Sequence, residues 1–171
     1  MQTCRSGRVN ERTTTRQSAC VPVSDFSLVE SSGTITSNSQ QERRFLDFVL
    51  DSKPTCPTVL ANGGDNISPL WLGGGHEWCR TAIDRLLGEA EPDAPGGRVS
   101  VYVCAECADL GCGAITVLVE RSDATVSWRN WGYQNNYDDW FVRLDDLPDV
   151  TFDAAQYALT LRAVLDRLHS R

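Results

Sequence analysis

The clearest hydrophobic pattern lies in the second half of the chain, where β-prone runs alternate with short turns. Strands are predicted at residues 98–103, 114–120 and 125–131, with a turn at 121–124. Strands that are joined by such short connections pair in antiparallel fashion. This part of the chain therefore predicts a three-stranded antiparallel β-meander.

Helical spacing of apolar residues appears on both sides of this meander. One helix is predicted to begin after the glycines at 73–75 and to stop at Gly88, and another is predicted to begin at Asp153. Each presents one apolar stripe: Trp78, Ile83, Leu86 and Leu87 in the first, and Tyr157, Leu161, Val164, Leu165 and Leu168 in the second. Because predicted strands and helices alternate irregularly along the chain, we expect the α+β class. The expected fold is an antiparallel β-meander packed with two or three helices, including a C-terminal helix.

The first part of the chain has weaker patterns. In FSLVESSGTIT, two short β-prone runs flank Ser32 and Gly33, which predicts a hairpin. Residues 40–50 favour a short helix over a strand, because apolar side chains recur three and four positions apart: Phe45, Phe48 and Val49. Residues 51–69 are interrupted by proline and glycine and are predicted to be loop.

Charge divides the chain into two parts. Residues 1–20 carry four arginines against one glutamate, a net charge of +3, and have almost no apolar side chains, so we expect a disordered leader. The total charge of −7 leaves −10 for residues 21–171, which we expect to fold as a single α+β domain. An acidic body repels phosphate backbones, which argues against a nucleic-acid partner.

Hydropathy and cysteine content indicate the cellular compartment. No apolar run approaches the roughly 18 to 20 residues that cross a bilayer, and residues 1–20 hold no hydrophobic secretion signal. We therefore expect a cytoplasmic protein with no membrane partner. Its seven cysteines would stay reduced there, which favours metal binding or thiol chemistry over a disulfide framework.

Three of these cysteines lie on the turn between the first two predicted meander strands. Cys104 and Cys107 form a C-x-x-C pair, whose sulfurs can face one point while backbone N–H groups stabilise a thiolate. Cys112 follows, and the glycines at 111 and 113 give the backbone the freedom to return it to the same point. Three soft ligands predict a zinc site of the Cys3His or Cys4 type.

The fourth zinc ligand is predicted to be His76 or Cys79, which GGGHEWCR places three positions apart on one face of a helix start. Two alternatives stay open: reduced thiols that only pack, and reversible disulfide chemistry of Cys104 and Cys107. A thioredoxin-type pair lies between a strand and a helix. This pair lies between two strands, which counts against that enzyme type but not against a redox-sensing switch.

The segment WRNWGYQNNYDDW, residues 128–140, combines flat aromatic faces with neutral amides. Such a mixture lines sites for polar organic ligands or partner loops. The candidate ligand or partner surface consists of Trp131, Tyr133, Gln134, Asn135, Asn136 and Tyr137. The alternative is structural: a long loop closes over the sheet, its aromatic rings cap the core and its amides make turns.

Three stretches together carry a resemblance: YVCAECADLGCGAITV with its C-x-E-C-x-D-L-G-C-G turn, WRNWGYQNNY, and the closing FDAAQY. They resemble a family of small uncharacterised bacterial proteins, chiefly actinobacterial, some of which carry an automatic oxidoreductase label. The resemblance covers about residues 98–165 and implies no catalytic residue. Ala105 and Ala108 stand where Pro and Gly are expected in the family.

These patterns favour a non-enzymatic binding or regulatory module that contains a structural zinc ion and recognises a small molecule or a protein. The alternative is a thiol-dependent oxidoreductase or redox sensor that uses Cys104 and Cys107. The chain contains no nicotinamide or flavin fingerprint and no Ser, His, Asp arrangement. The binding module is therefore the leading hypothesis.

Overall fold

Two antiparallel sheets and the helices α2 and α3 make up most of the computed structural model, which describes residues 22–34, 42–56 and 66–169. The smaller sheet has β2 at its centre and consists of β1 (Phe26–Thr34), β2 (Glu42–Leu50) and β3 (Lys53–Pro54). β1 and β2 pair along their whole length, from Phe26 opposite Leu50 to Thr34 opposite Glu42.

The larger sheet contains the predicted meander. Its strands follow the order β4 (Asn66–Ile67), β5 (Val99–Cys104), β6 (Ala114–Arg121), β7 (Thr125–Gln134) and β8 (Val142–Arg143). β9 (Val150–Asp153) pairs with the first half of β7, and β8 pairs with its end. Both therefore lie along the edge of β7 that β6 leaves open. The antiparallel meander β5–β6–β7 is confirmed.

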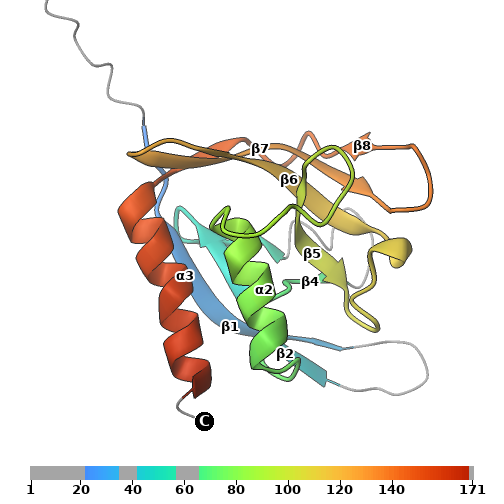
Figure 1. The fold of residues 1–171 in the computed structure, drawn as a ribbon, viewed down its shortest axis with the longest axis horizontal. Helices are drawn as coiled ribbons and strands as arrows, with labels where there is room; N and C mark the ends of the chain where they lie inside the picture. Colours follow the sequence, from blue (N-terminus) through green and yellow to red (C-terminus); the bar gives the residue numbers. More distant parts are fainter. Residues whose placement is uncertain (1–21, 35–41, 57–65, 170–171) are drawn as a thin grey trace, which may run out of the picture.

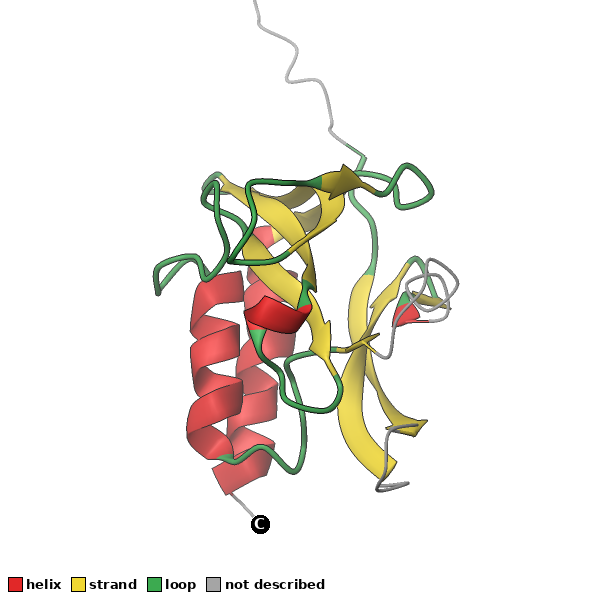
Figure 2. Ribbon diagram, turned by 90° about the vertical axis from the view of Figure 1, so that its right-hand side faces the viewer, coloured by secondary structure: helices red, strands yellow, loops and turns green. Residues whose placement is uncertain are grey.

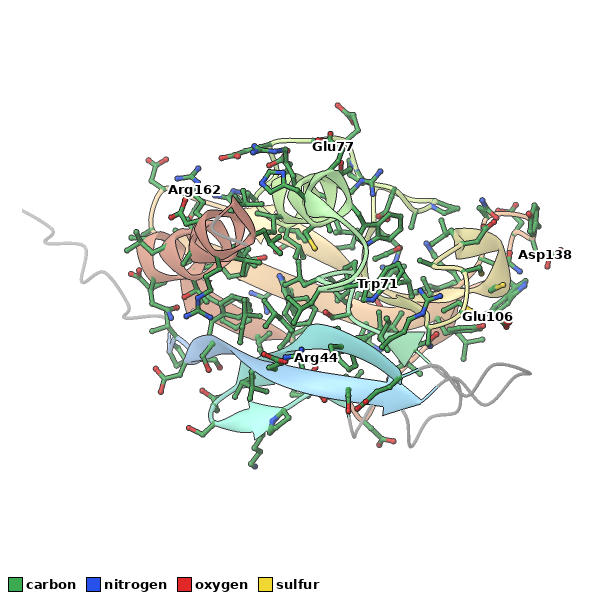
Figure 3. The ribbon with its side chains drawn as sticks, turned by 90° about the horizontal axis from the view of Figure 1, so that it is seen from below. Arg44, Trp71, Glu77, Glu106, Asp138 and Arg162 are labelled. Carbon is green, nitrogen blue, oxygen red and sulfur yellow. The ribbon has the colours of Figure 1, made fainter. Side chains whose placement is uncertain are left out.

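The two helices α2 (His76–Leu86) and α3 (Ala154–His169) confirm both predicted helices. Asp153 opens α3, since its Oδ1 accepts the backbone N–H of Gln156 at 2.8 Å. In Figure 1 the two helices run side by side beneath β6 and β7. Figures 2 and 3 show the helices on one side, the three-stranded sheet on the other and strands of the larger sheet between them. The α+β class is confirmed.

The predicted helix at residues 40–50 is wrong, because this segment forms β2. Its residues 45–48 are buried one after another, so both faces of the strand are covered here. A strand that is buried on both faces need not alternate apolar and polar residues. The spacing of its apolar side chains therefore resembles that of a helix, although the segment is a strand.

The predicted hairpin at Ser32 and Gly33 is also wrong. β1 continues through both residues, and Gly33 lies opposite Arg43 of β2. A Cβ at Gly33 would approach the Cγ2 of Ile67 at 3.2 Å, so this glycine permits a close approach of β4 instead of a turn.

The predicted loop at residues 51–69 lies partly outside the described residues, and the predicted leader lies wholly outside them. The predicted loop at 51–69 contains β3 and β4 near its ends, and its residues 57–65 lie outside the described residues. The leader predicted at residues 1–20 lies outside them as well. Among the helices that the structure describes, none is long and apolar enough to span a membrane.

Trp128 of β7 forms the centre of the core. Its ring centroid lies 5.1 to 6.2 Å from five aromatic rings of β1, β2, β7, β9 and α3: Phe26, Phe48, Trp131, Phe152 and Tyr157. Its Nε1–H donates to the Tyr157 hydroxyl at 3.1 Å, and that hydroxyl donates to the carbonyl of Leu86 at 3.2 Å. One buried indole thus connects both sheets and both helices.

A buried polar contact ties β5 to the smaller sheet. The Tyr102 hydroxyl donates to Oδ1 of Asp47 at 2.5 Å, and the backbone N–H of Cys56 donates to Oδ2 at 3.2 Å. Burial raises the pKa of Asp47, although these hydrogen bonds act in the opposite direction. The contact fixes the strand that ends at the cysteine turn.

The hydrogen-bond chain through Tyr157 predicts a measurable stability loss. Tyr157→Phe leaves the Trp128 indole N–H and the Leu86 carbonyl without their buried partner, so the free energy of unfolding should fall by about 1 to 3 kcal/mol. Urea denaturation measures this change. The matched control is Tyr137→Phe, which removes a hydroxyl from a side chain that is 76% exposed and should change stability little. Equal effects of the two substitutions would contradict the assignment.

Candidate metal centre

The cysteine turn, residues 104–113, connects β5 to β6. Cys104 is the last residue of β5, and Cys112 ends the short 3-10 helix η1 (Leu110–Cys112). The Ala108 N–H donates to the Cys104 carbonyl at 2.9 Å, and the Asp109 carboxylate accepts the Gly111 N–H at 2.7 Å. These two bonds fold the chain back, so that the third cysteine returns towards the first two.

The three thiols meet at one point. The Sγ atoms of Cys104, Cys107 and Cys112 all lie within 4.8 Å of one another, and those of Cys107 and Cys112 are 3.3 Å apart. Cys107 and Cys112 are exposed, whereas Cys104 is half-buried. Among the described His, Cys, Asp and Glu side chains, these three cysteines form the group whose ligand atoms lie close enough together to hold one metal ion.

The charges of the cluster favour a bound cation. Burial raises the pKa of Cys104, but the N–H groups of Cys107 and Glu106 and the neighbouring thiols outweigh it, so the net pKa lies below the ordinary value. The pKa of Cys112 is raised to about 12 by its hydrogen bond with Cys107 and by the negative charges of Cys104 and Cys107. Three thiolates therefore repel one another until a metal ion compensates their charge.

The spacing of the sulfurs fits a tetrahedral metal. Zinc binds thiolate sulfur at about 2.3 Å, which places two sulfurs of one tetrahedron about 3.8 Å apart. The observed separations of 3.3 Å and up to 4.8 Å lie within 1 Å of that value. The donor set is soft, as thiophilic metals require.

Two side chains from other strands hold the turn in place. Arg43 of β2 donates from Nη2 to the Glu106 carbonyl at 2.5 Å, and its guanidinium lies 4.1 Å from the ring centroid of Trp71. Tyr133 of β7 donates its hydroxyl to the Cys112 carbonyl at 2.8 Å. Arg43 was not predicted from the sequence, because no local pattern connects it with a turn that lies three strands away in the chain.

The structure does not bring His76 or Cys79 into the cluster. Neither belongs to the group of ligand atoms that lie within 4.8 Å of one another. Cys79 is fully buried, its thiol donates to the Trp71 carbonyl at 3.2 Å, and burial raises its pKa to about 11. The predicted helix start is correct, but α2 directs this thiol into the core.

The candidate ligand surface in residues 128–140 is divided between core and turn. Trp131 is 1% exposed and donates its indole N–H to a backbone carbonyl at 2.9 Å. Gln134 is also buried, and its Nε2 donates to another backbone carbonyl at 3.1 Å. Asn135 accepts the N–H groups of Tyr137 and Asp138 and so makes a turn. These three side chains take the structural role that was the alternative.

Two tyrosines of this segment instead cover the cysteine turn. A Cβ at Gly113, where φ is 92°, would lie 2.0 Å from the Tyr133 hydroxyl, and one at Gly111 would lie 2.4 Å from the Tyr137 ring. Tyr137 and its neighbour Asn136 are exposed. Figure 3 shows Glu106 of the turn and Asp138 of the covering loop at the same end of the molecule. The glycines of the turn thus make room for aromatic rings.

Comparisons with protein-family models, with curated proteins and with solved structures found no match for this chain. The geometry of the described residues is therefore the basis for inferring a function. That geometry permits two kinds of chemistry: three thiolates can bind one soft metal ion, or two of the thiols can join in a disulfide.

The close contact at Gly113 generates a prediction about the turn. Gly113→Ala adds a methyl group where the Tyr133 hydroxyl lies, and it does so at a positive φ, so the free energy of unfolding should fall by about 2 to 4 kcal/mol. Gly97→Ala is the matched control, because Gly97 also has a positive φ, 70°, but no atom lies within 4 Å of the added Cβ. It should cost about 1 kcal/mol. Chemical denaturation of both variants measures the difference, and equal losses would show that Tyr133 does not occupy this space.

Proposed function

We propose that the protein is a metal-binding module whose cysteine turn holds zinc through Cys104, Cys107 and Cys112. The observation that carries this proposal is the convergence of three Sγ atoms within 4.8 Å on one turn. A thiolate-rich tetrahedral set is typical of zinc among the divalent metals of the cytoplasm. The ion would connect the end of β5 to the chain that enters β6, and it would thereby stabilise the fold.

The proposed role is binding or regulation in the cytoplasm instead of catalysis. Cys107 and Cys112 lie exposed on a turn, where a partner protein or a small molecule can reach the ion. Asp109, an acidic group of this turn, accepts the Gly111 N–H and so serves its geometry. With three protein thiolates, the fourth coordination position goes to a further donor such as water or a partner side chain.

A redox role is the second candidate, and one distance favours it. The Sγ atoms of Cys107 and Cys112 are 3.3 Å apart, so this pair, and not the predicted C-x-x-C pair alone, is a candidate for disulfide formation. An S–S bond of about 2.05 Å would require the two sulfurs to approach by a little over 1 Å. Oxidised glutathione would accept the two electrons and two protons and would leave as two glutathione thiols.

Metal content tests the leading proposal. Protein that is purified gently should contain about one zinc per chain, and a chelator should lower its melting temperature, because metal binding is coupled to folding. Cys104→Ser, Cys107→Ser and Cys112→Ser should each lower the zinc stoichiometry. Elemental analysis and thermal unfolding measure these effects.

Two further variants identify the fourth ligand. His76→Gln and Cys79→Ala should leave the zinc stoichiometry unchanged if water or a partner takes the fourth position. A loss in either variant would assign that residue to the site and would mean that α2 moves when metal binds. Background zinc in the unmodified protein would refute the metal proposal.

Timed alkylation separates the metal proposal from the redox proposal. If zinc caps the thiolates, Cys104, Cys107 and Cys112 should react slowly until a chelator is added. Cys56 and Cys79 should stay unreactive in the folded protein, because burial raises both pKa values to about 11. Mass spectrometry at each cysteine measures the rates. Fast modification of Cys107 and Cys112 that ignores the chelator, together with a reversible glutathione midpoint, would favour the redox role.

A further inference from the structure

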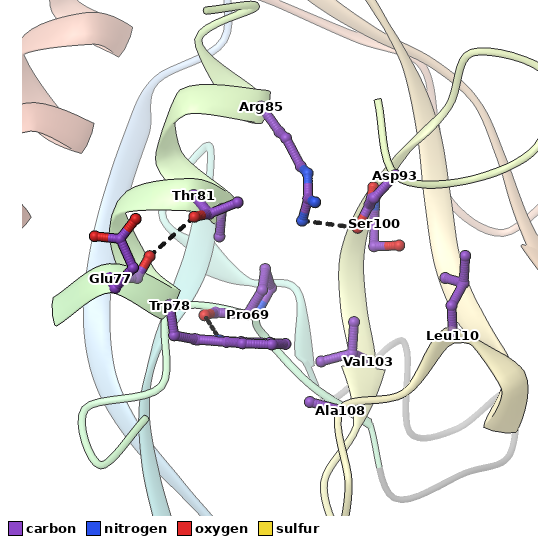
Figure 4. A pocket seen from close by; sticks show the side chains of 11 residues that line it. Pro69, Glu77, Trp78, Thr81, Arg85, Asp93, Ser100, Val103, Ala108 and Leu110 are labelled. Carbon is purple, nitrogen blue, oxygen red and sulfur yellow. Dashed lines mark hydrogen bonds and ion pairs between the residues drawn. The ribbon is translucent and has the colours of Figure 1, made fainter. Parts of the chain in front are cut away.

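A pocket of about 300 Å³ lies between α2 and β5, next to the cysteine turn. Figure 4 shows its two walls: α2 contributes Trp78, Thr81 and Arg85, and the opposite side contributes Ser100 and Val103 of β5. Leu110 of the cysteine turn closes one side. The pocket is mostly apolar with a few polar groups, which is the usual composition of a small-molecule site.

An unpaired hydroxyl is the first sign that this pocket takes a ligand. Ser100 is only 3% exposed, and its Oγ has no hydrogen-bond partner among the described residues. The backbone N–H of Ser100 is satisfied, since it donates to Oδ1 of Asp93 at 2.9 Å. A buried hydroxyl without a partner destabilises a protein, so native structures rarely keep one without a functional reason.

A partly engaged guanidinium is the second sign. Arg85 contacts Asp93 through a single Nη1 to Oδ2 distance of 3.5 Å, which is long for an ion pair. The rest of its planar donor set is therefore available to a bound acceptor. In Figure 4 the guanidinium points from α2 towards Asp93, beside which Ser100 lies, whereas the Glu77 carboxylate points away from the pocket. Arg85 can thus donate to a ligand, and the buried Ser100 hydroxyl can join it after its side chain rotates towards the pocket that Ser100 lines.

A fixed aromatic face is the third feature. Trp78 is 38% exposed, although its indole N–H donates to the Pro69 carbonyl at 2.7 Å and so holds the ring in place. Val103 and Leu110 lie across the pocket from it. A flat apolar group between these side chains would be stabilised by burial and by contact with the indole.

We propose that this pocket binds a small monocarboxylate with a flat apolar body, such as an aryl acid. The carboxylate would accept hydrogen bonds from the Arg85 guanidinium and the Ser100 hydroxyl, and the ring would lie against Trp78. A cavity of about 300 Å³ accommodates one ring with a short acid chain. This inference goes beyond the metal proposal and does not depend on it.

Titration of the isotope-labelled full chain with phenylacetate tests the proposal by NMR. Saturable shifts are expected at the amides of Ser100, Arg85 and Leu110, whereas benzylamine, which carries the opposite charge on a similar body, should shift them little. Saturable binding of benzylamine that matches phenylacetate would overturn the proposal, as would phenylacetate shifts that never saturate or that map elsewhere.

Substitutions test the two polar contacts separately. Arg85→Gln should weaken phenylacetate binding about tenfold or more, because a charge-assisted hydrogen bond is lost. Arg80→Gln is the matched control, since Arg80 lies on the same helix but does not line the pocket, and it should leave the affinity unchanged. Unaltered binding in Arg85→Gln would overturn the proposal.

Ser100→Ala gives an independent readout. It should weaken phenylacetate binding several-fold, yet it should keep or raise the melting temperature of the free protein, because it removes an unpaired buried hydroxyl. A clear drop of the melting temperature with unchanged affinity would show that the hydroxyl has a structural role, and this result would also overturn the proposal.

Discussion

The burial of Trp128 is the interaction on which the rest of the structure depends. Its indole contacts rings from β1, β2, β9 and α3, and its N–H begins the hydrogen-bond chain through Tyr157 to the end of α2. One side chain thus joins elements that are far apart in the sequence. An aromatic residue suits this position because it buries a large apolar surface and still donates one hydrogen bond. The two sheets are held at a fixed distance as a result.

This fixed core positions the cysteine turn. β5 enters the turn directly from the core, where Tyr102 is bonded to Asp47 of β2. Arg43 of the same strand holds the outer part of the turn through the Glu106 carbonyl. Three cysteines whose thiolates would repel one another therefore stay together, although two of them are exposed. The surrounding fold supplies the order that a short loop with positive φ at Ala108 could not maintain alone.

The cysteine turn also forms a wall of the pocket beside α2. Its Ala108 and Leu110 line that pocket, and its three thiols form the proposed metal centre. A ligand in the pocket and an ion on the thiols would thus contact the same short segment of backbone. Two ligands that stabilise one conformation of a shared element bind cooperatively. This arrangement suits a module in which metal occupancy and small-molecule binding influence each other.

Local patterns determined α2, α3, the meander and the cysteine turn, because helical periodicity, strand alternation and close cysteine spacing depend on neighbours in the chain. Tertiary structure decided the rest. β2 did not alternate because packing covers both of its faces, and Cys79 was drawn into the core by the orientation of α2. The contact of Arg43 with the turn and the pocket around Ser100 arise from segments that meet only after folding. No periodicity in one sequence records such long-range contacts, since they follow from the packing of whole elements.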